Sequence, residues 1–196
     1  MKNIVAKVSD IYMKYGIKSV TMDDVARELC ISKKTLYQYF KNKDDLVKKV
    51  IQYNMSSMHN EMRKLISKKA NAIEELLFVS KFISQYFNKI NTSVTYDLQK
   101  YYPVIWKNIN SDRRKHIYER IKDNMKKGIK EGLYRKDLNI EIIANFYLFR
   151  IEMSQTFDLV IENKYTFEEL FNTSFNYHIR GIANHEGIKY LESVIK

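Results

Sequence analysis

The sequence contains few of the residues that interrupt helices. Its 196 residues include one proline, Pro103, and five glycines. Proline and glycine are the two residues that most disfavour a helix interior, so their scarcity favours helices with short connections over a strand-rich fold. No stretch alternates polar and apolar residues for long, as a half-buried strand would. These absences predict an all-α protein.

Cysteine and long apolar runs are scarce as well. The single cysteine, Cys30, excludes an internal disulfide and fits a reducing compartment. No stretch approaches the ~18 uninterrupted apolar residues that suggest a membrane span. The first residues, MKNIVAKVSDIYMKYG, lack the continuous apolar core of a signal peptide. We therefore expect a cytoplasmic protein.

Signatures of catalysis and metal binding are also absent. The sequence has no glycine-rich phosphate loop, no Gly-x-Ser-x-Gly and no His-Glu-x-x-His. It has no Glu-x-x-His pair of the kind that holds two iron ions in helical bundles. Its four histidines have no metal-ligand spacing; they are His59, His116, His178 and His185. We expect no enzymatic activity, no metal and no cofactor.

The charge is strongly positive. The chain has 34 Lys and Arg against 23 Asp and Glu, which gives a net charge of +11 and a pI near 9.5. Such an excess suggests a polyanionic partner, most often nucleic acid, although a solvated lysine-rich surface would look the same. The lysines are spread over several segments rather than gathered on one amphipathic helix, which argues against a membrane surface.

The N-terminal region reads as three short helices followed by a long one. Residues 2 to about 15 place apolar side chains at three- and four-residue spacing, and Gly16 follows where a helix commonly ends in a left-handed turn. Thr21 begins a second helix with acidic residues in its first turn, and Ser32 caps a third. The fourth helix runs from about Lys43 into the sixties.

The remainder reads as aromatic-rich helices with no repeat and no low-complexity linker. Pro103 breaks the second of these helices and Gly132 closes the third. The pattern predicts an N-terminal domain at 1–48 and a larger C-terminal domain at 49–196, joined by a continuous helix. The expected helices are 71–91, 94–109, 112–131, 139–162 and 166–184.

Residues 21–40 have the pattern of a helix-turn-helix. Ala26 supplies the small residue needed where two helices approach closely, and Cys30, Ile31 and Ser32 form the tight turn. Apolar residues at suitable spacing fill the space between the helices: Val25, Leu29, Ile31 and Leu36. The second helix then presents polar side chains that could reach a major groove.

This region resembles the TetR family of bacterial transcription regulators. The matching strings are Tyr15-Gly16, then Val20-Thr21-Met22-Asp23-Asp24-Val25-Ala26, then Ile31-Ser32-Lys33-Lys34-Thr35-Leu36-Tyr37-Gln38-Tyr39-Phe40, then Asn42-Lys43-Asp44-Asp45-Leu46. The resemblance implies a three-helix helix-turn-helix head joined to a C-terminal helical-bundle body that binds a ligand and dimerises. It is strong over about residues 1–50 and only architectural beyond them.

The chain departs from the family at Cys30, where glycine is usual. Glycine suits a turn with positive φ, and a side chain there costs about 1 kcal/mol. The turn is therefore expected to be slightly strained, or to lie in an allowed region. A redox role for Cys30 is the alternative interpretation, although a lone cysteine in a turn is usually inert.

The resemblance also implies which residues contact double-stranded DNA. Thr21, Tyr39 and Lys43 resemble phosphate clamps that set the register on the duplex. Lys33, Lys34 and Gln38 are the candidates for reading bases, because lysine can donate to guanine and glutamine can pair with adenine. Ser32, Thr35 and Tyr37 face or flank the groove. Leu36 and Phe40 are expected in the core.

The last helices suggest a homodimer. Segment 139–162 is apolar nearly all round, and segment 166–184 carries a clear apolar stripe. Two such helices and their symmetry mates would form a four-helix interface, as the resemblance implies. The interface candidates are Phe157, Val160, Phe167, Phe171, Phe175, His178 and Ile179.

A ligand cavity is the less determined part of the interpretation. Aromatic and apolar side chains of the body could line a pocket, or could simply fill its core. The lining candidates are Phe82, Tyr86, Tyr102, Trp106, Phe146, Phe149 and Met153. The predicted function is a sequence-specific repressor released from a near-palindromic operator by a small apolar or aromatic molecule. The alternative is a DNA-binding dimer without such a ligand, controlled by a protein partner or acting architecturally.

Overall fold

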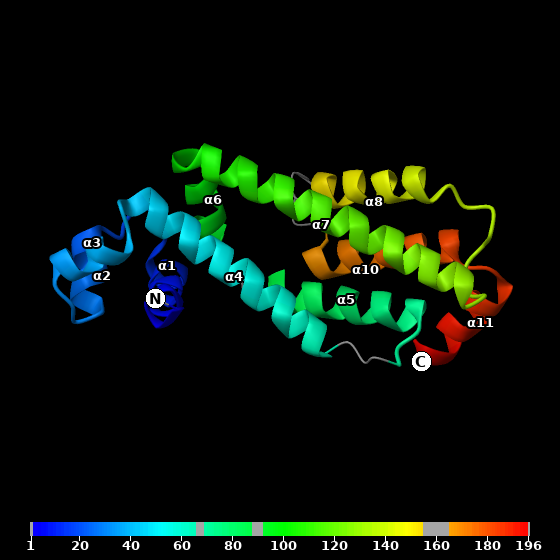
Figure 1. Ribbon diagram of the computed structural model, residues 1–196. Coiled ribbons are helices and arrows are strands. Elements are labelled where there is room, and N and C mark those ends of the chain that lie inside the picture. Colours follow the sequence, from blue (N-terminus) through cyan, green and yellow to red (C-terminus); the bar gives the residue numbers. More distant parts are fainter. Residues whose placement is uncertain (1, 66–68, 88–91, 155–164, 196) are drawn as a thin grey trace. The chain divides into compact units, whose positions relative to one another are not determined.

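The fold is all-α, as predicted. The computed structural model describes residues 2–65, 69–87, 92–154 and 165–195 (Figure 1). Within these ranges no strand forms, and the one extended pairing is an isolated bridge between Tyr134 and Ala183. The helices are α1 Lys2–Tyr15, α2 Met22–Glu28, α3 Lys33–Tyr39, α4 Lys43–Leu65, α5 Ala72–Phe87, α6 Thr92–Tyr101, α7 Pro103–Lys130, α8 Ile140–Ser154, α10 Phe167–Ile182 and α11 His185–Val194.

The chain divides into two compact units. The head unit comprises Met1–Leu65 with Lys89–Ser111, and the body unit comprises Ile66–Asn88 with Asp112–Lys196. The head unit is therefore larger than the expected domain at 1–48. It is larger because α4 continues through position 48 and because α6 contributes Val94 and Leu98 to the apolar core of the head.

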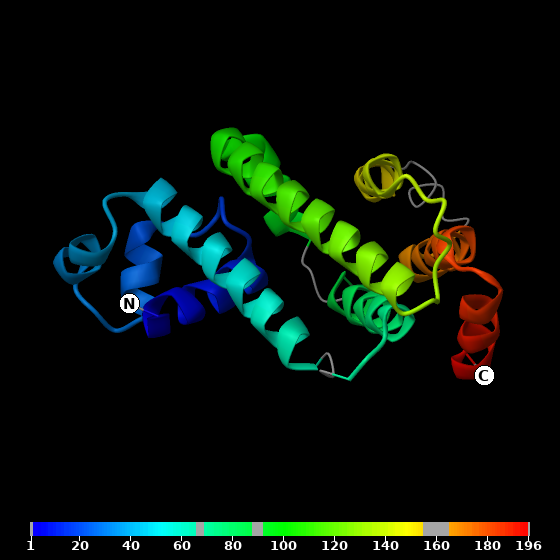
Figure 2. The same cartoon turned by 45° about the vertical axis from the view of Figure 1, so that its right-hand side comes forward.

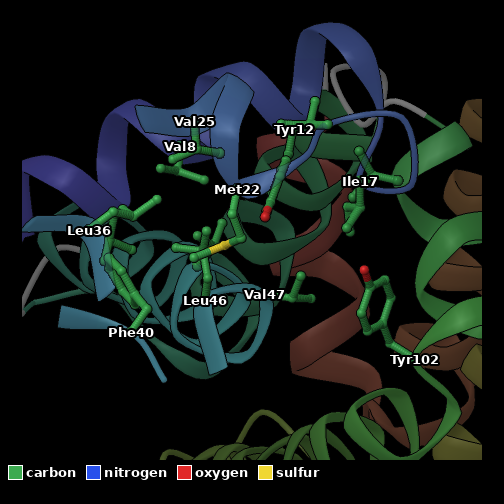
Figure 3. Close-up of a cluster of buried hydrophobic side chains, with 14 of the residues drawn as sticks. Val8, Tyr12, Ile17, Met22, Val25, Leu36, Phe40, Leu46, Val47 and Tyr102 are labelled. Atoms are coloured by element: carbon green, nitrogen blue, oxygen red, sulfur yellow. The ribbon is translucent and has the colours of Figure 1, made fainter. Parts of the chain in front are cut away.

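The head unit is held together by an apolar cluster under α2 and α3. Helix α1 packs along α4, and α2 packs against α3 (Figure 2). Side chains from all four helices, together with Tyr102, converge on one cluster (Figure 3). Val8, Leu36 and Leu46 are fully buried, and each contributes about 1.5–3 kcal/mol through removal of its apolar surface from water.

Two helix boundaries differ from the sequence interpretation. Pro103 was expected to interrupt a helix over 94–109, with a separate helix at 112–131; instead α6 ends at Tyr101 and Pro103 begins the long helix α7. Proline is well tolerated at the first position of a helix, where its missing N–H has no partner to lose. Helix α11 was not predicted, although Asn184 caps it by accepting from the Gly187 N–H at 3.0 Å.

The body unit is organised around buried Tyr134. Its hydroxyl donates to the Asn124 side chain at 3.1 Å, and Asn124 donates to the Ala72 carbonyl at 2.9 Å. A Cβ on Gly128 would lie 2.1 Å from the Tyr134 ring, so only glycine fits there. Helices α5 and α10 lie side by side (Figures 1 and 2). No helix among the described residues is long and apolar enough to cross a bilayer.

Candidate nucleic-acid interface

Helix α2 begins with a reciprocal cap. The Thr21 hydroxyl oxygen accepts from the Asp24 N–H at 3.1 Å, and the Thr21 N–H donates to the Asp24 carboxylate at 2.9 Å. The hydroxyl also donates to the same carboxylate at 2.6 Å. These bonds hold the pKa of Asp24 below its ordinary value, chiefly through the Thr21 hydroxyl. The cap fixes the start of α2 and, with it, the exposed Thr21.

The turn between α2 and α3 is a Schellman motif. The Cys30 N–H donates to the Arg27 carbonyl and the Ile31 N–H donates to the Ala26 carbonyl, both at 3.0 Å, which is the bond pair that defines this helix ending. The motif requires a left-handed conformation at the first of the two donor residues, and Cys30 has φ +53°. Cys30 therefore adopts the left-handed conformation that the family's usual glycine suits.

Helix α3 is anchored by its buried side and open on the other. Ser32 caps it by accepting from the Thr35 N–H at 3.0 Å. Leu36 and Phe40 are buried, as predicted, and they lie one helical turn apart. Because these two residues fix the inner face, the polar side chains of α3 lie outward. Exposed around this face are Ser32, Lys33, Lys34, Tyr37, Gln38 and Tyr39, with Thr35 half-buried.

Lys33 has an internal partner that DNA would have to replace. Its ammonium lies 2.7 Å from an Asp23 carboxylate oxygen, and both side chains are more than half exposed. This hydrogen bond raises the pKa of Lys33 above its ordinary value. Exposed ion pairs contribute little net stability. The pair therefore orients the Lys33 side chain, and another partner can replace Asp23 at little cost.

Lys43 lies at the first turn of α4, facing the segment that connects α1 and α2. Its ammonium donates to the Lys18 carbonyl at 3.2 Å. Burial, and then the positive charge of Lys18, lower the pKa of Lys43. A half-buried ammonium at a helix N-terminus, where backbone N–H groups also favour anions, is suited to a phosphate.

The predicted DNA-contacting residues therefore occur on three connected elements. Thr21 begins α2, six residues flank or form α3, and Tyr39 and Lys43 bracket the α3–α4 turn. Residues 31–50 carry six lysines against two aspartates. The sequence interpretation did not identify Lys18, whose only signal was its position two residues after Gly16.

The predicted ligand-lining residues divide between the two units. Tyr102 and Trp106 pack with the apolar core of the head unit. Phe146 and Phe149 are 66% and 62% exposed on α8, because the opposite face of that helix, at Ala144 and Tyr147, is the one that packs inward. Phe82 is half-buried in the body unit. The side chains of Tyr86 and Met153 lie outside those that the structure describes.

The predicted dimer residues divide in a similar way. Phe175 and Ile179 are core residues of the protomer, at 3% and 0% exposed, so their assignment to a subunit interface is wrong. His178 is half-buried with its ring 4.3 Å from that of Tyr147. The apolar stripe of α10 therefore faces the core of its own protomer. Phe157 and Val160 lie outside the described residues, as do the side chains of Phe167 and Phe171.

No cluster of metal-ligating side chains occurs in the ranges that the structure describes. A shallow depression on the body unit is lined by residues of α10 and the segment before it, among them Tyr165, Glu169 and Tyr177. The Glu169 carboxylate already accepts the Thr166 N–H in the N-terminal cap of that helix. Neither feature resembles a catalytic site.

Comparison with known proteins agrees with this geometry. Residues 10–50 match the family model for bacterial regulatory proteins of the tetR family. A curated relative, the fatty acid metabolism regulator protein of Bacillus subtilis, is 23% identical over 189 residues, which cover 92% of this chain and 94% of the relative. The chain therefore spans nearly the whole length of that protein.

Solved structures share the fold along most of the chain. The transcriptional regulator FadR of Bacillus subtilis, in complex with stearoyl-CoA, has a TM-score of 0.67 and 20% identity, covering 91% of this chain and 97% of FadR. A regulator from Saccharomonospora viridis, in complex with choline, has a TM-score of 0.72 and 17% identity, covering 93% and 96%.

A capped helix-turn-helix with an open, lysine-rich second helix defines a DNA-binding transcription regulator. Residues 10–50 match the TetR family model, and a relative that the chain matches over nearly its whole length is a regulator protein. Members of this family are transcription regulators, which confirms the expectation that the protein is not an enzyme. Regulators of the family bind DNA and small-molecule ligands and act as dimers.

The left-handed turn gives a direct test of the head geometry. Replacing Cys30 with glycine removes the steric cost of a Cβ at φ +53°. We expect the free energy of unfolding to rise by up to about 0.5 kcal/mol, because the greater freedom of glycine in the unfolded chain offsets part of the cost of about 1 kcal/mol. Urea denaturation measures the change. Cys30→Ala keeps the Cβ and should not stabilise; equal stabilisation by both variants would mean that the thiol, not the backbone, is unfavourable.

Proposed function

We propose that this protein is a homodimeric repressor that reads a near-palindromic operator through α3 and releases it when a small apolar molecule binds. The observation that supports this most strongly is the outward row of α3, meaning its exposed polar side chains Lys33, Lys34 and Gln38. Buried Leu36 and Phe40 hold this face outward. The protein would act on DNA in the cytoplasm.

The chemistry of each side chain indicates whether it would contact bases or phosphates. Lys33, Lys34 and Gln38 carry donors that can reach base edges in the major groove. Thr21, Tyr39 and Lys43 hold the phosphate backbone on either side and carry no sequence information. Ser32, Thr35 and Tyr37 complete the surface that meets the groove.

The second subunit would cover the exposed face of α8. Ile142, Phe146 and Phe149 follow one another at four- and three-residue spacing and are each half or more exposed. A row of large apolar side chains left in water is typical of an interface, and helix faces of this kind pair about a two-fold axis. Two-fold symmetry would let the two α3 helices enter successive major grooves, about 34–36 Å apart or a multiple of that spacing.

The effector is proposed from relatives and composition. FadR of Bacillus subtilis was solved with stearoyl-CoA, and a curated relative regulates fatty acid metabolism. The chain is 13% aromatic, and aromatic side chains commonly line sites for apolar ligands. We propose a long apolar chain as the ligand, with an aromatic molecule as the other possibility within this class. It would release DNA by favouring a different spacing of the two heads.

The first test is operator selection. The purified protein is mixed with random duplexes at two salt concentrations, and the retained DNA is sequenced. We expect a near-palindrome, lost in the triple variant Lys33→Ala, Lys34→Ala and Gln38→Ala. Because a good base contact is worth about 1–3 kcal/mol, operator affinity should fall by about a hundredfold or more.

A matched triple variant controls for charge and composition. Lys136, Lys189 and Gln85 are exposed residues of the body unit, so their replacement by alanine removes the same charge without touching α3. This variant should retain the operator. Salt-sensitive retention without sequence enrichment by the wild type would contradict specific reading and favour an architectural role.

The second test concerns the effector. Long-chain fatty acids, their CoA thioesters and aromatic acids are added to the operator complex, and release is followed by fluorescence anisotropy. We expect an acyl compound to release the DNA and to raise the melting temperature. At a ligand concentration of a hundred times Kd, the free energy of unfolding should rise by about 2.7 kcal/mol. CoA alone controls for competition by its phosphates. Failure of the whole panel in both measurements would favour the dimer without a small-molecule ligand.

The third test concerns the dimer. In the double variant Phe146→Glu and Phe149→Glu, charges would be buried without partners if α8 forms the interface. We expect a monomer in analytical ultracentrifugation and a large loss of operator affinity. Val104 is also highly exposed, at 71%, but lies on α7 in the head unit, so Val104→Glu should remain dimeric. A dimeric double variant would exclude this face of α8.

A further inference from the structure

A buried carboxylate joins α6 to the segment between α1 and α2. The side chain of Asp97 is only 8% exposed. One of its oxygens, Oδ2, accepts from the backbone N–H of Ile17 at 2.8 Å and from that of Lys18 at 2.7 Å. Charge-assisted bonds of this kind are about twice as strong as neutral ones. They fix two residues of the head to a helix that lies about eighty positions away in sequence.

The shape of the turn depends on the same contact. Gly16 has φ +80°, and a Cβ there would lie 3.2 Å from Asp97 Oδ2. Glycine is thus favoured twice, once for the left-handed conformation and once for the close approach of the carboxylate. The turn therefore brings two consecutive N–H groups to a single oxygen.

Lys18 is the residue through which this contact reaches the DNA-binding surface. Its carbonyl accepts from the Lys43 ammonium at 3.2 Å, and its own ammonium lies 4.5 Å from the centre of the Tyr101 ring on α6. An ammonium has three donors, so Lys43 can keep the Lys18 carbonyl and still offer two to a phosphate. If the turn moved, Lys43 would lose this bond, which directs its ammonium.

The charge of Asp97 also acts on the Lys43 ammonium. Burial and the neighbouring Lys18 disfavour the charged form of Lys43, and Asp97 and Asp44 favour it. Asp97 is the buried member of this pair, at 8% exposed, whereas Asp44 is exposed. The carboxylate therefore holds the turn and also opposes the lowering of the Lys43 pKa by burial and Lys18.

We propose that Asp97 is a positioning residue for DNA binding: it fixes the 16–18 turn to α6 and thereby aims the Lys43 ammonium at a DNA phosphate. This inference rests on the proposed function, in which Lys43 is a phosphate contact. Asp97 itself touches no DNA.

The contact can be tested without DNA by amide hydrogen exchange. In Asp97→Ala the Ile17 and Lys18 N–H groups lose their acceptor, and we expect their exchange to accelerate by about tenfold or more. Asp97→Asn keeps an oxygen in the same place and should retain part of the protection. Ser9→Ala is the control, because it removes a comparably buried bond of the same unit, from Ser9 to Asn54 at 2.8 Å; it should leave the two amides unchanged.

The consequence for DNA is measured by the dependence of affinity on salt. Loss of one phosphate contact lowers the slope of log K against log salt by about 0.9 and weakens binding by about tenfold near 0.1 M salt. We expect this in Asp97→Ala and not in Ser9→Ala, at a temperature where both variants are folded. In a double-mutant cycle, Asp97→Ala should add little to Lys43→Gln, because both remove the same contact.

An unchanged slope in Asp97→Ala, or additive effects of the two substitutions, would overturn the proposal and leave Asp97 a purely structural residue. A duplex of random sequence serves as well as the operator, because phosphate contacts act in both. The slope can therefore fall as expected even if no operator is found. In that case sequence-specific reading fails and the role of Asp97 stands.

Discussion

The burial of Leu36 and Phe40 decides which side of α3 can meet another molecule. Each contributes about 1.5–3 kcal/mol by leaving water, and their one-turn spacing fixes the rotation of the helix about its axis. Rotation of α3 would expose both residues and bury lysines without partners, which is far more costly than the loss of any surface contact. The outward row of polar side chains is thus a consequence of apolar packing rather than of attraction between those side chains.

The weak contacts of that outward row suit a surface that must exchange partners. Lys33 is paired with Asp23, but both side chains are more than half exposed, and such pairs contribute little to folding. A base or phosphate can therefore replace the aspartate at small cost. Lys43 differs, because its half-buried ammonium is directed by a backbone carbonyl. Lys33 can therefore change its partner at small cost, whereas the ammonium of Lys43 is held by the backbone.

The sequence predicted the head well because its signals are local. Thr21, Ser32 and Gly16 act through caps and turns spanning a few residues, and such chemistry is readable from spacing alone. The contact of Asp97 with the 16–18 turn has no comparable signal, since nothing in the sequence of α6 indicates which N–H groups its carboxylate meets. The same limit explains why the head unit extends to residues 89–111 beyond the expected domain.

Apolar patterns in the sequence indicated which helix faces are covered. They did not show whether the core of the protomer or a second subunit covers them. The stripe of α10 was read as a subunit interface, yet Phe175 and Ile179 fill the core of their own protomer. The all-round apolar character of α8 did contain an exposed face, but Phe146 and Phe149 were assigned to a cavity. Hydrophobic periodicity gives the direction of an apolar face and does not show what covers it.

The two left-handed positions of the head show how packing decides what a turn tolerates. Both Gly16 and Cys30 have positive φ, and each ends a helix where glycine is preferred. Cys30 is exposed, so its side chain meets only the local backbone cost of about 1 kcal/mol. At Gly16 a Cβ would also approach the Asp97 carboxylate to 3.2 Å and would weaken the bonds that hold Lys18. A side chain is therefore better tolerated in the turn before α3 than in the turn that Asp97 holds.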